Sequence, residues 1–526
     1  MPPPLFLSGL SRPELEALLV EQSGEVAVLK QIVGELRDEI ARLKGLKGRP
    51  RIKPSGMDKG TEPSKPAKKE QRRGRGKVTP RVSIDEKVIN AEVPPGSRFK
   101  GHEPFLVQDL VITVRATRYQ RERWLTPDGR TILAPLPEEI GGHFGPELRR
   151  FVLMQYHQGQ STLPRLLVLL RSVGVSVSKR QLQRLLTEKH DDLIAEARDV
   201  LRAGLETSPF VSVDDTGARH AGKNGFCTQI GNDRFTWFGT RSSKSRLNFL
   251  DLLRAGHTDY VLNDPAYDYM RNQGLPAATI ARLRAASETW FGDQTAWKAH
   301  LDRLDFNALS VVPDPVRVAS EGALWGSVQS HKFLCDAVVL SDDAGQFNIG
   351  RHALCWVHAE RLVHKLDTFT DKHRAAQKKV RGLIWNFYAS LKAYRLKPGQ
   401  RRSLELRARF DRIFRRRTGF ATLDRLLARL HANKAELLMV LDRPEIPLHT
   451  NGSENDIRCQ VTRRKVSAGT RSDMGRDCRD AFLSLAKTCG KHGIAFWDYL
   501  GSRLRVAGHT IVEPLDHYVR ARNCPA

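Results

Sequence analysis

The chain lacks the apolar segments that a membrane protein or an exported protein carries. No apolar run in its 526 residues approaches the roughly 18 residues that a membrane-spanning helix needs. The first residues, MPPPLFLSGLSRPELEALL, contain no basic segment followed by a long apolar one. No secretory signal peptide is therefore expected. We expect no membrane partner and a cytoplasmic location.

Cysteine is also scarce. The seven cysteines form an odd and scattered set, which does not suggest a disulfide framework. A reducing compartment such as the cytosol fits this composition. With 40% hydrophobic residues the chain has enough apolar material for globular domains, and its length predicts two to four of them.

Acidic residues are in deficit: 59 of them stand against 86 basic residues, which leaves a net charge of +27. Such a field attracts polyanions, and nucleic acid is the commonest polyanion in a cytosol. A membrane surface fits less well, because the basic residues are spread over the whole chain and no basic amphipathic helix stands out. The composition therefore favours a nucleic-acid partner over a protein that is merely basic.

The N-terminal part predicts a coiled-coil helix in a segment 1–45, followed by a basic disordered linker, 46–82. Apolar residues recur at heptad spacing between 19 and 43, namely Leu19, Val26, Val33 and Ile40 with Leu29, Leu36 and Leu43. This spacing is typical of a parallel dimer, although a single amphipathic helix explains it too. The linker lacks aromatic residues and is rich in Pro, Gly, Lys and Arg, so it fits a solvated arm that contacts phosphates.

Residues 83–205 predict a DNA-binding region. Its first part, up to about residue 140, alternates apolar and polar residues as short strands do. A helix over 161–172, a turn at Gly174 and a second helix from about Ser178 then follow. Polar and basic residues near the start of the second helix match a helix-turn-helix for the major groove, near 161–187.

Three acidic residues follow apolar runs or begin a helix. Asp214 follows FVSV, Asp342 follows VVLS, and Glu454 lies in HTNGSENDIR, where a helix begins. Functional groups gather at strand ends in open α/β sheets. Carboxylates are the ligands that Mg²⁺ prefers, and two divalent ions serve phosphodiester chemistry on DNA. Taken singly, each acid is better explained as a turn or capping residue.

The combination of VDDTGAR, SDDAGQF, CWVHAERLVHKL and NGSENDIR resembles bacterial transposases of the DDE, ribonuclease-H-like class, insertion-sequence family sixty-six type. The resemblance implies that Asp214, Asp342 and Glu454 are the catalytic triad and that they hold Mg²⁺ (or Mn²⁺). That family often carries a cysteine-rich zinc segment near the N-terminus. This chain has no Cys-x-x-Cys pair, so no zinc site is expected there.

The resemblance also implies the fold class and the domain order. We expect an α/β fold in which a ribonuclease-H-like mixed sheet, flanked by helices, fills residues 206–505. Helical insertions are expected near 265–325 and 367–445, and residues 506–526 form a C-terminal tail. The helix-turn-helix region and the N-terminal coiled-coil helix would precede the sheet.

The choice among neighbouring acids has open alternatives. Asp215 would point to the other face of a strand that carries Asp214, because side chains alternate along a strand. Asp264 is a rival for the second acid, since it also follows a short strand, DYVLN. We favour Asp342 over Asp264 because the CWVH segment follows it at once, as the resemblance requires, and leave Asp343 as a turn residue.

Two further groups of residues accompany the acids. Cys355 and His358 have a spacing that could begin a zinc site, but no second pair follows. A buried cysteine and a hydrogen-bonded histidine are the better explanation. Basic residues follow Glu454 and could contact DNA phosphates; they are Arg458, Arg463, Arg464, Lys465 and Arg471.

The sequence therefore predicts a DNA transposase that cuts transposon ends and joins them to target DNA. It would be a homo-oligomer near the bacterial nucleoid, working with accessory proteins of the same element. The alternatives are a sequence-specific DNA-binding protein or transposase relic without catalysis, and a metal-dependent nuclease that cuts without joining. Neither a regulator nor a relic has a use for three such acids.

Overall fold

The computed structural model describes residue 57 and residues 83–137, 142–309 and 311–521. The predicted coiled coil at 19–43 and almost all of the basic linker lie outside the described residues. The chain forms two compact units. The larger unit contains Asp191–Ile494 and the segment from Glu513, and the smaller unit contains the described residues from 83 to 190 together with Ala495–Val512.

A five-stranded mixed sheet organises the larger unit, in the order β5-β4-β3-β8-β9. The strands β3 (Phe210–His220), β4 (Lys223–Gly231) and β5 (Thr236–Arg241) are antiparallel neighbours. The strands β8 (Val338–Ser341) and β9 (Arg351–Leu354) run parallel to β3. The predicted α/β class is confirmed at this level, as a mixed sheet flanked by helices.

The strand β8 is short, and its whole length is buried. All four residues of VVLS are buried, which is typical of a strand in a parallel pair covered on both faces. Its register with β3 joins Phe210 to Val338 and Ser212 to Leu340. The pairing with β8 then ends, but β3 continues along β4 as far as His220.

Helices from both ends of the larger unit cover the sheet. The helix α18 (Asn451–Ser467) packs on β3 and β4, and α19 (Asp473–Lys491) packs on β5. The helix α6 (Asp191–Thr207), which leads into β3, packs on α19 and on α21 (Leu515–Ala521). The strands and the helices α18 and α19 share one buried apolar cluster, which includes Ala218, Phe238, Ile457 and Leu483.

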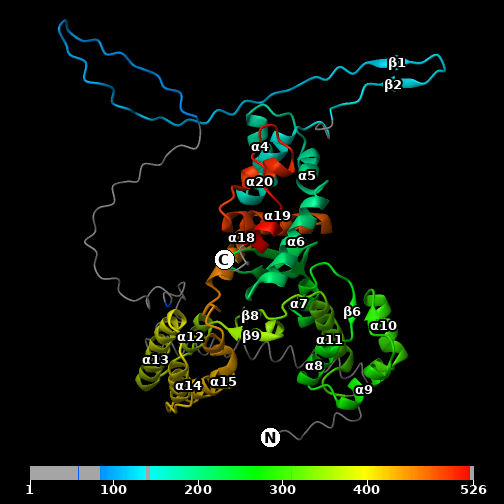
Figure 1. The fold of residues 1–526 in the computed structure, drawn as a ribbon, viewed down its shortest axis with the longest axis vertical. Coiled ribbons are helices and arrows are strands. Elements are labelled where there is room, and N and C mark those ends of the chain that lie inside the picture. Colours follow the sequence, from blue (N-terminus) through cyan, green and yellow to red (C-terminus); the bar gives the residue numbers. More distant parts are fainter. Residues whose placement is uncertain (1–56, 58–82, 138–141, 310, 522–526) are drawn as a thin grey trace. The chain divides into compact units, whose positions relative to one another are not determined.

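Between β5 and β8 the chain forms a helical group with a two-stranded ribbon, drawn in green in Figure 1. The helix α11, which ends just before β8, packs on α7, α8 and the ribbon strand β6. The elements are α7 (Arg246–Leu253), β6 (Tyr260–Val261), α8 (Asp264–Asn272), α9 (Ala277–Ala285), β7 (Trp290–Phe291), α10 (Gln294–Arg303) and α11 (Pro315–Ser330).

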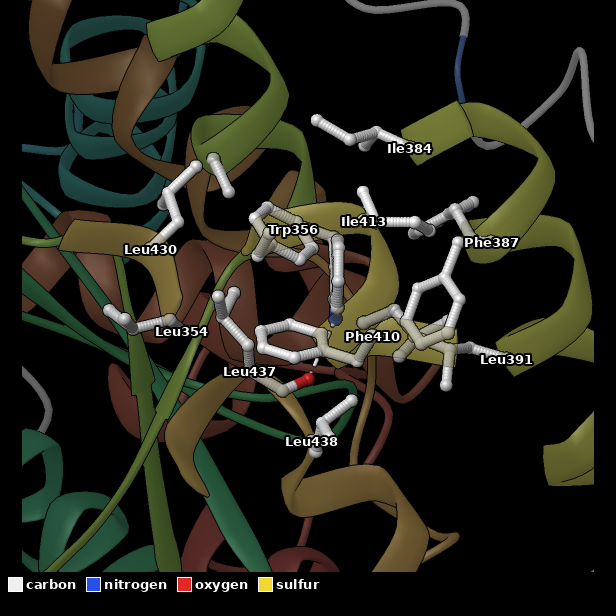
Figure 2. Packing of buried hydrophobic residues seen from close by; sticks show 14 of the residues in the cluster. Leu354, Trp356, Ile384, Phe387, Leu391, Phe410, Ile413, Leu430, Leu437 and Leu438 are labelled. Atoms are coloured by element: carbon white, nitrogen blue, oxygen red, sulfur yellow. Dashed lines mark hydrogen bonds between the residues drawn. The ribbon is translucent and has the colours of Figure 1, made fainter. Parts of the chain in front are cut away.

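A second helical group follows β9 and returns the chain to α18. Trp356 lies at its centre, with Phe387 and Phe410 packed around the indole ring (Figure 2). The Trp356 Nε1–H donates to the carbonyl oxygen of Leu437 over 2.8 Å, which fixes the start of α12. The helices are α12 (Trp356–His364), α13 (Asp371–Leu396), α14 (Gln400–Phe414), α15 (Ala421–Ala432), α16 (Lys434–Leu437) and α17 (Met439–Asp442).

The smaller unit contains the two helices that flank Gly174. The helix α4 (Leu163–Ser172) is capped by Thr162, and α5 (Lys179–Thr187) starts with a capping box formed by Ser178 and Gln181. Gly174 has a φ of +93°, which favours glycine in the turn between them. The helices α3 (Pro146–Leu153) and α20 (Phe496–Arg503) pack together in the same unit.

Only a small part of the alternating sequence before α3 forms β-strands. Among residues 83–137 the regular structure is a hairpin of β1 (Arg123–Leu125) and β2 (Thr131–Leu133). Apolar side chains along this stretch, such as Phe105 and Val111, are exposed, so alternation there does not reflect one buried face. Within the described part of the chain, no helix is both long enough and apolar enough to span a bilayer.

Replacing Trp356 by phenylalanine is expected to destabilise the larger unit. The Leu437 carbonyl would lose its donor inside the core, which costs about 1–3 kcal/mol, and the smaller ring would leave unfilled space. Denaturant unfolding followed by circular dichroism measures the loss. The matched control is Trp290→Phe, because Trp290 is 61% exposed; equal losses in both variants would contradict the expectation.

Candidate active site

The two predicted aspartates lie side by side because of the strand register. Ser212 pairs with Leu340 in the parallel β3–β8 ladder, so continuing the same register by two residues brings Asp214 level with Asp342. Asp342 is the second residue after Leu340 and directly follows the end of β8. Asp214, in contrast, lies within β3 rather than at its end, because β3 continues along β4. That position corrects the expectation of a strand end at Asp214.

Burial and charge perturb Asp214. Burial, with smaller contributions from the negative charges of Asp342 and Asp215, raises the pKa of its carboxyl to about 6. The backbone N–H of Asp215, which donates to Asp214 Oδ1 over 2.8 Å, and the nearby His358 act in the opposite direction. Asp342 is therefore close enough to Asp214 to disfavour the ionised form of Asp214.

A local turn holds Asp342. Its Oδ1 accepts a hydrogen bond from the backbone N–H of Ala344 over 3.1 Å. The preceding Ser341 is fully buried and its hydroxyl lies 2.8 Å from Nε2 of His352 on β9. These contacts hold the end of β8 and the carboxylate that follows it.

Glu454 reaches the same region from the first turn of α18. Arg361 of α12 contacts it with both terminal nitrogens, Nη1 to Oε1 at 2.9 Å and Nη2 to Oε2 at 3.4 Å. The Nε2 atom of His358, one helical turn earlier, lies 3.5 Å from Oε1. Glu454 is only 20% exposed, so these two partners hold its carboxylate in place.

His358 connects the three acids electrostatically. Burial lowers the pKa of its imidazole, but contact with Cys355 and the charges of Glu454 and Asp342 outweigh burial and raise it above the ordinary value. Cys355 is buried before α12, where its sulfur accepts from the backbone N–H of Thr450. Among the described residues, Cys355 and His358 belong to no group of three metal-ligating side chains. The predicted roles of buried cysteine and hydrogen-bonded histidine agree with these contacts.

Of the competing acids, Asp264 lies elsewhere, whereas Asp215 and Asp343 are near the site but have other partners. Asp264 begins α8, its side chain is 90% exposed, and its ion-pair partner is Arg284 at 3.5 Å. Asp343 turns away toward the second helical group, where Arg429 and Asn433 contact it. Asp215 contacts Lys244 and Gln346. In the described part of the chain, none of these three carboxylates pairs with the arginine and histidine that hold Glu454.

A second acidic residue on α18 fixes the helix to the sheet. Asp456 is buried, and its Oδ2 accepts from the Thr236 hydroxyl and from Lys491 Nζ, each over 2.6 Å. Residues two apart on a helix point in directions roughly 200° apart. Asp456 therefore fixes the helix on one face while Glu454 projects from the other.

A pocket of about 300 Å³ lies beside Asp342 and Asp343. Its lining combines acidic, basic and apolar side chains, among them Asp342, His358, Arg361, Lys365, Arg429 and Leu430. Sequence reasoning had missed Arg361. The available signal was its spacing of three residues from His358 on one helix, which places both side chains on the same face.

The basic residues after Glu454 are divided between structural and exposed positions. Arg463 is buried, and Arg464 contacts the carbonyl oxygen of Gly217 on β3. Arg458, Lys465 and Arg471 are exposed. Arg463 and Arg464 are held within the protein, so only Arg458, Lys465 and Arg471 of the predicted group are exposed to contact DNA phosphates.

Comparison with known proteins identifies related sequences. A family model described as "Transposase IS66 family" matches residues 332–477, which include Asp342 and Glu454. A protein of Sinorhizobium fredii (strain NBRC 101917 / NGR234), named "Uncharacterized protein y4jO", is 49% identical over 323 residues. The matched part covers 61% of this chain and the whole of that protein.

Replacing Asp214 by asparagine is expected to stabilise the metal-free protein at pH 7.5. The folded pKa of about 6 lies above the unfolded value of about 3.9, so ionisation of Asp214 costs stability as the pH rises between these values. The full cost, up to about 3 kcal/mol, is present above pH 6 and absent below pH 4. An asparagine side chain at this position does not ionise and would not incur the cost.

Thermal unfolding at several pH values measures this difference. The stabilisation should shrink as the pH is lowered from 7.5 toward 4.5, and the exposed control Asp264→Asn should show no such trend. A gain that is the same at both ends of this range would contradict the assignment.

Proposed function

The chain belongs to the IS66 family of transposases, and on that premise we propose that it cuts DNA at transposon ends and joins the freed ends to target DNA. The observation that carries the proposal is the level register of Asp214 with Asp342, together with His358, which lies 3.5 Å from Glu454 and has its pKa raised by both Glu454 and Asp342. We propose these three carboxylates as the catalytic residues and the metal ligands.

The topology of the sheet supports a ribonuclease-H-like catalytic domain within the proposed range 206–505, of which the part from Ala495 belongs to the smaller unit. Three antiparallel strands followed by two strands parallel to the first bring Asp214 of β3 next to the end of β8. Helical groups interrupt this core after β5 and after β9, in positions that would shape a path for DNA.

The donor set fits divalent magnesium or manganese. All three side chains offer carboxylate oxygens, which these ions prefer over nitrogen or sulfur. Burial and, to a smaller extent, the charge of Asp342 raise the pKa of Asp214, and a bound cation would offset both effects. In the described part of the chain the ligand oxygens of the three carboxylates do not all lie within 4.8 Å of one another. Two divalent ions would activate the attacking oxygen and stabilise the leaving oxygen.

The protein's own residues position these groups. Arg361 and His358 orient the carboxylate of Glu454, and the turn at Ala344 orients that of Asp342. In the first step, a water oxygen bonds to phosphorus, loses its proton, and the departing 3′ oxygen leaves as a hydroxyl. In the second, that hydroxyl attacks a phosphorus of the target, and a target 3′ oxygen departs with a proton. The number of phosphodiester bonds is unchanged in the second step.

DNA binding would come from several parts of the chain. We propose α4 and α5 as the helix-turn-helix, because Lys179, Arg180 and Gln183 at the start of α5 are exposed while Leu182 and Leu186 are buried. The linker 46–82 would add phosphate contacts, and the heptads at 19–43 would pair two copies for two transposon ends. Accessory proteins of the same element would complete the assembly near the nucleoid.

The catalytic assignment is tested with a labelled transposon-end duplex and Mg²⁺. The wild-type protein is expected to cleave the end and transfer it to a second duplex. Asp342→Asn should lower both rates by several orders of magnitude while leaving duplex binding intact, because it removes a proposed ligand without changing volume.

Two matched controls come from the rival acids. Asp264→Asn and Asp343→Asn are expected to retain cleavage and transfer. If Asp264→Asn lost activity while Asp342→Asn retained it, Asp264 rather than Asp342 would be the second catalytic acid. Binding without cleavage by the wild-type protein would favour a DNA-binding relic, and cleavage without transfer would favour a nuclease.

Replacing Lys179 and Arg180 together by alanine is expected to weaken binding to transposon-end DNA. Each lost phosphate contact reduces the steepness of the salt dependence by about one unit on a log–log plot. Gel-shift titrations at several salt concentrations measure the change. Lys298→Ala, an exposed lysine on α10, serves as the charge control, and an equal effect in that variant would argue against α5 as the recognition helix.

A further inference from the structure

Two histidines and an aspartate meet in the first helical group, outside the proposed active site. His257 lies between α7 and β6, Asp259 directly precedes β6, and His331 caps the C-terminal end of α11. The ligating atoms of all three lie within 4.8 Å of one another. Among the described residues, this is the group of three His, Cys, Asp or Glu side chains that has this geometry. The proposed transposase chemistry does not use these residues.

The distances from His331 to Asp259 are slightly shorter than those between two ligand atoms of one small cation. The Nε2 atom of His331 lies 3.1 Å from each carboxylate oxygen of Asp259. Tetrahedral zinc with Zn–N and Zn–O bonds of about 2.0–2.2 Å has neighbouring ligand atoms about 3.3–3.5 Å apart. The rings of His257 and His331 stack at 3.6 Å and 15°. They would need to tilt toward each other to share an ion.

An outer hydrogen bond orients the carboxylate. The hydroxyl of Ser327, one turn before the end of α11, donates to Asp259 Oδ1 over 2.9 Å. Ligands of protein-bound metals commonly have such an outer partner, which fixes their orientation. Asp259 is almost fully buried, whereas 28% of the His331 side chain is exposed, so a water could complete the coordination from the solvent side.

The two neighbouring arginine side chains form hydrogen bonds with other groups. Arg254 donates to the backbone carbonyl of Asp259 and to the carboxylate of Asp251. Arg202 donates to the carbonyl of Ala255 and to Asp199. Their charges disfavour a second cation, so a metal here needs strong ligands of the imidazole type rather than carboxylates alone.

Residues on both sides of the cluster have positive φ angles. Ala255 and Gly256, just before His257, have φ angles of 49° and 91°, and Lys332, just after His331, has a φ of 61°. A Cβ at Gly256 would lie 2.4 Å from Cδ of Arg198, so only glycine fits there. Left-handed residues such as Ala255 and Lys332 cost on the order of 1–3 kcal/mol and gather at functional sites.

We propose that His257, Asp259 and His331 bind one zinc-class dication, which joins the end of α11 to the segment between α7 and β6. The position gives this ion a structural purpose. The chain passes from His331 to Leu334, whose N–H donates to the carbonyl of Leu205 on α6, and then enters β8. An ion at this point would therefore fix the segment that leads to Asp342.

Metal binding by the full-length protein tests this proposal. After EDTA treatment and removal of the chelator, calorimetry with Zn²⁺ and absorption spectroscopy with Co²⁺ measure binding. We expect one high-affinity equivalent, tetrahedral Co²⁺ bands and an increase in the unfolding temperature. Ser327→Ala should weaken affinity about 10- to 100-fold, and His257→Ala or His331→Ala should weaken it more.

Two variants serve as controls. His517→Ala removes an exposed histidine with an acidic neighbour, and Asp342→Asn removes a proposed catalytic ligand. Both should bind Zn²⁺ as the wild-type protein does, so this test is independent of transposase activity. Circular dichroism of each metal-free variant confirms that it is folded. Absence of tight binding by the wild-type protein, or undiminished binding by folded His257→Ala and His331→Ala, would overturn the proposal.

Discussion

The parallel pairing of β3 with β8 is the constraint on which the rest of the candidate site depends. Backbone hydrogen bonds between two buried apolar segments set the register, and the register places Asp214 level with Asp342. The two side chains repel each other, and the ladder keeps the backbone positions from which they project close together. The sheet therefore opposes the repulsion of two carboxylates, and the raised pKa of Asp214 measures the unfavourable environment that results.

Local sequence patterns were enough to predict some of this arrangement. The apolar run before Asp342 is short, continuous and followed by turn residues, and it forms β8 as predicted. The continuation of β3 beyond Asp214 could not be predicted in the same way. It depends on pairing with β4, and the polar residues after Asp214 carry no apolar signal of their own. Propensity at Asp264 was equally ambiguous, and only tertiary structure shows that this carboxylate faces solvent.

The contacts of Glu454 illustrate a second limit of sequence reasoning. Its partner Arg361 is 93 residues away in the chain, on a helix whose position depends on the burial of Trp356 against Leu437 and the phenylalanines around it. Nothing near Glu454 in the sequence identifies that partner. The resemblance of the segments to a transposase family indicated that the acids belong together, whereas the reason for their proximity lies in packing between distant elements.

The two acidic residues at the start of α18 have a consequence for how the protein can change during evolution. Asp456 is fastened to Thr236 and Lys491, and Glu454 projects from the other side of the same turn. One residue inserted or deleted between them would rotate Glu454 by about 100° about the helix axis. The helical group between β9 and α18, in contrast, leaves the sheet and returns to it, so its length can vary with little effect on the acids. Relatives should therefore differ in the distance from Asp342 to Glu454 while keeping the two-residue step from Glu454 to Asp456.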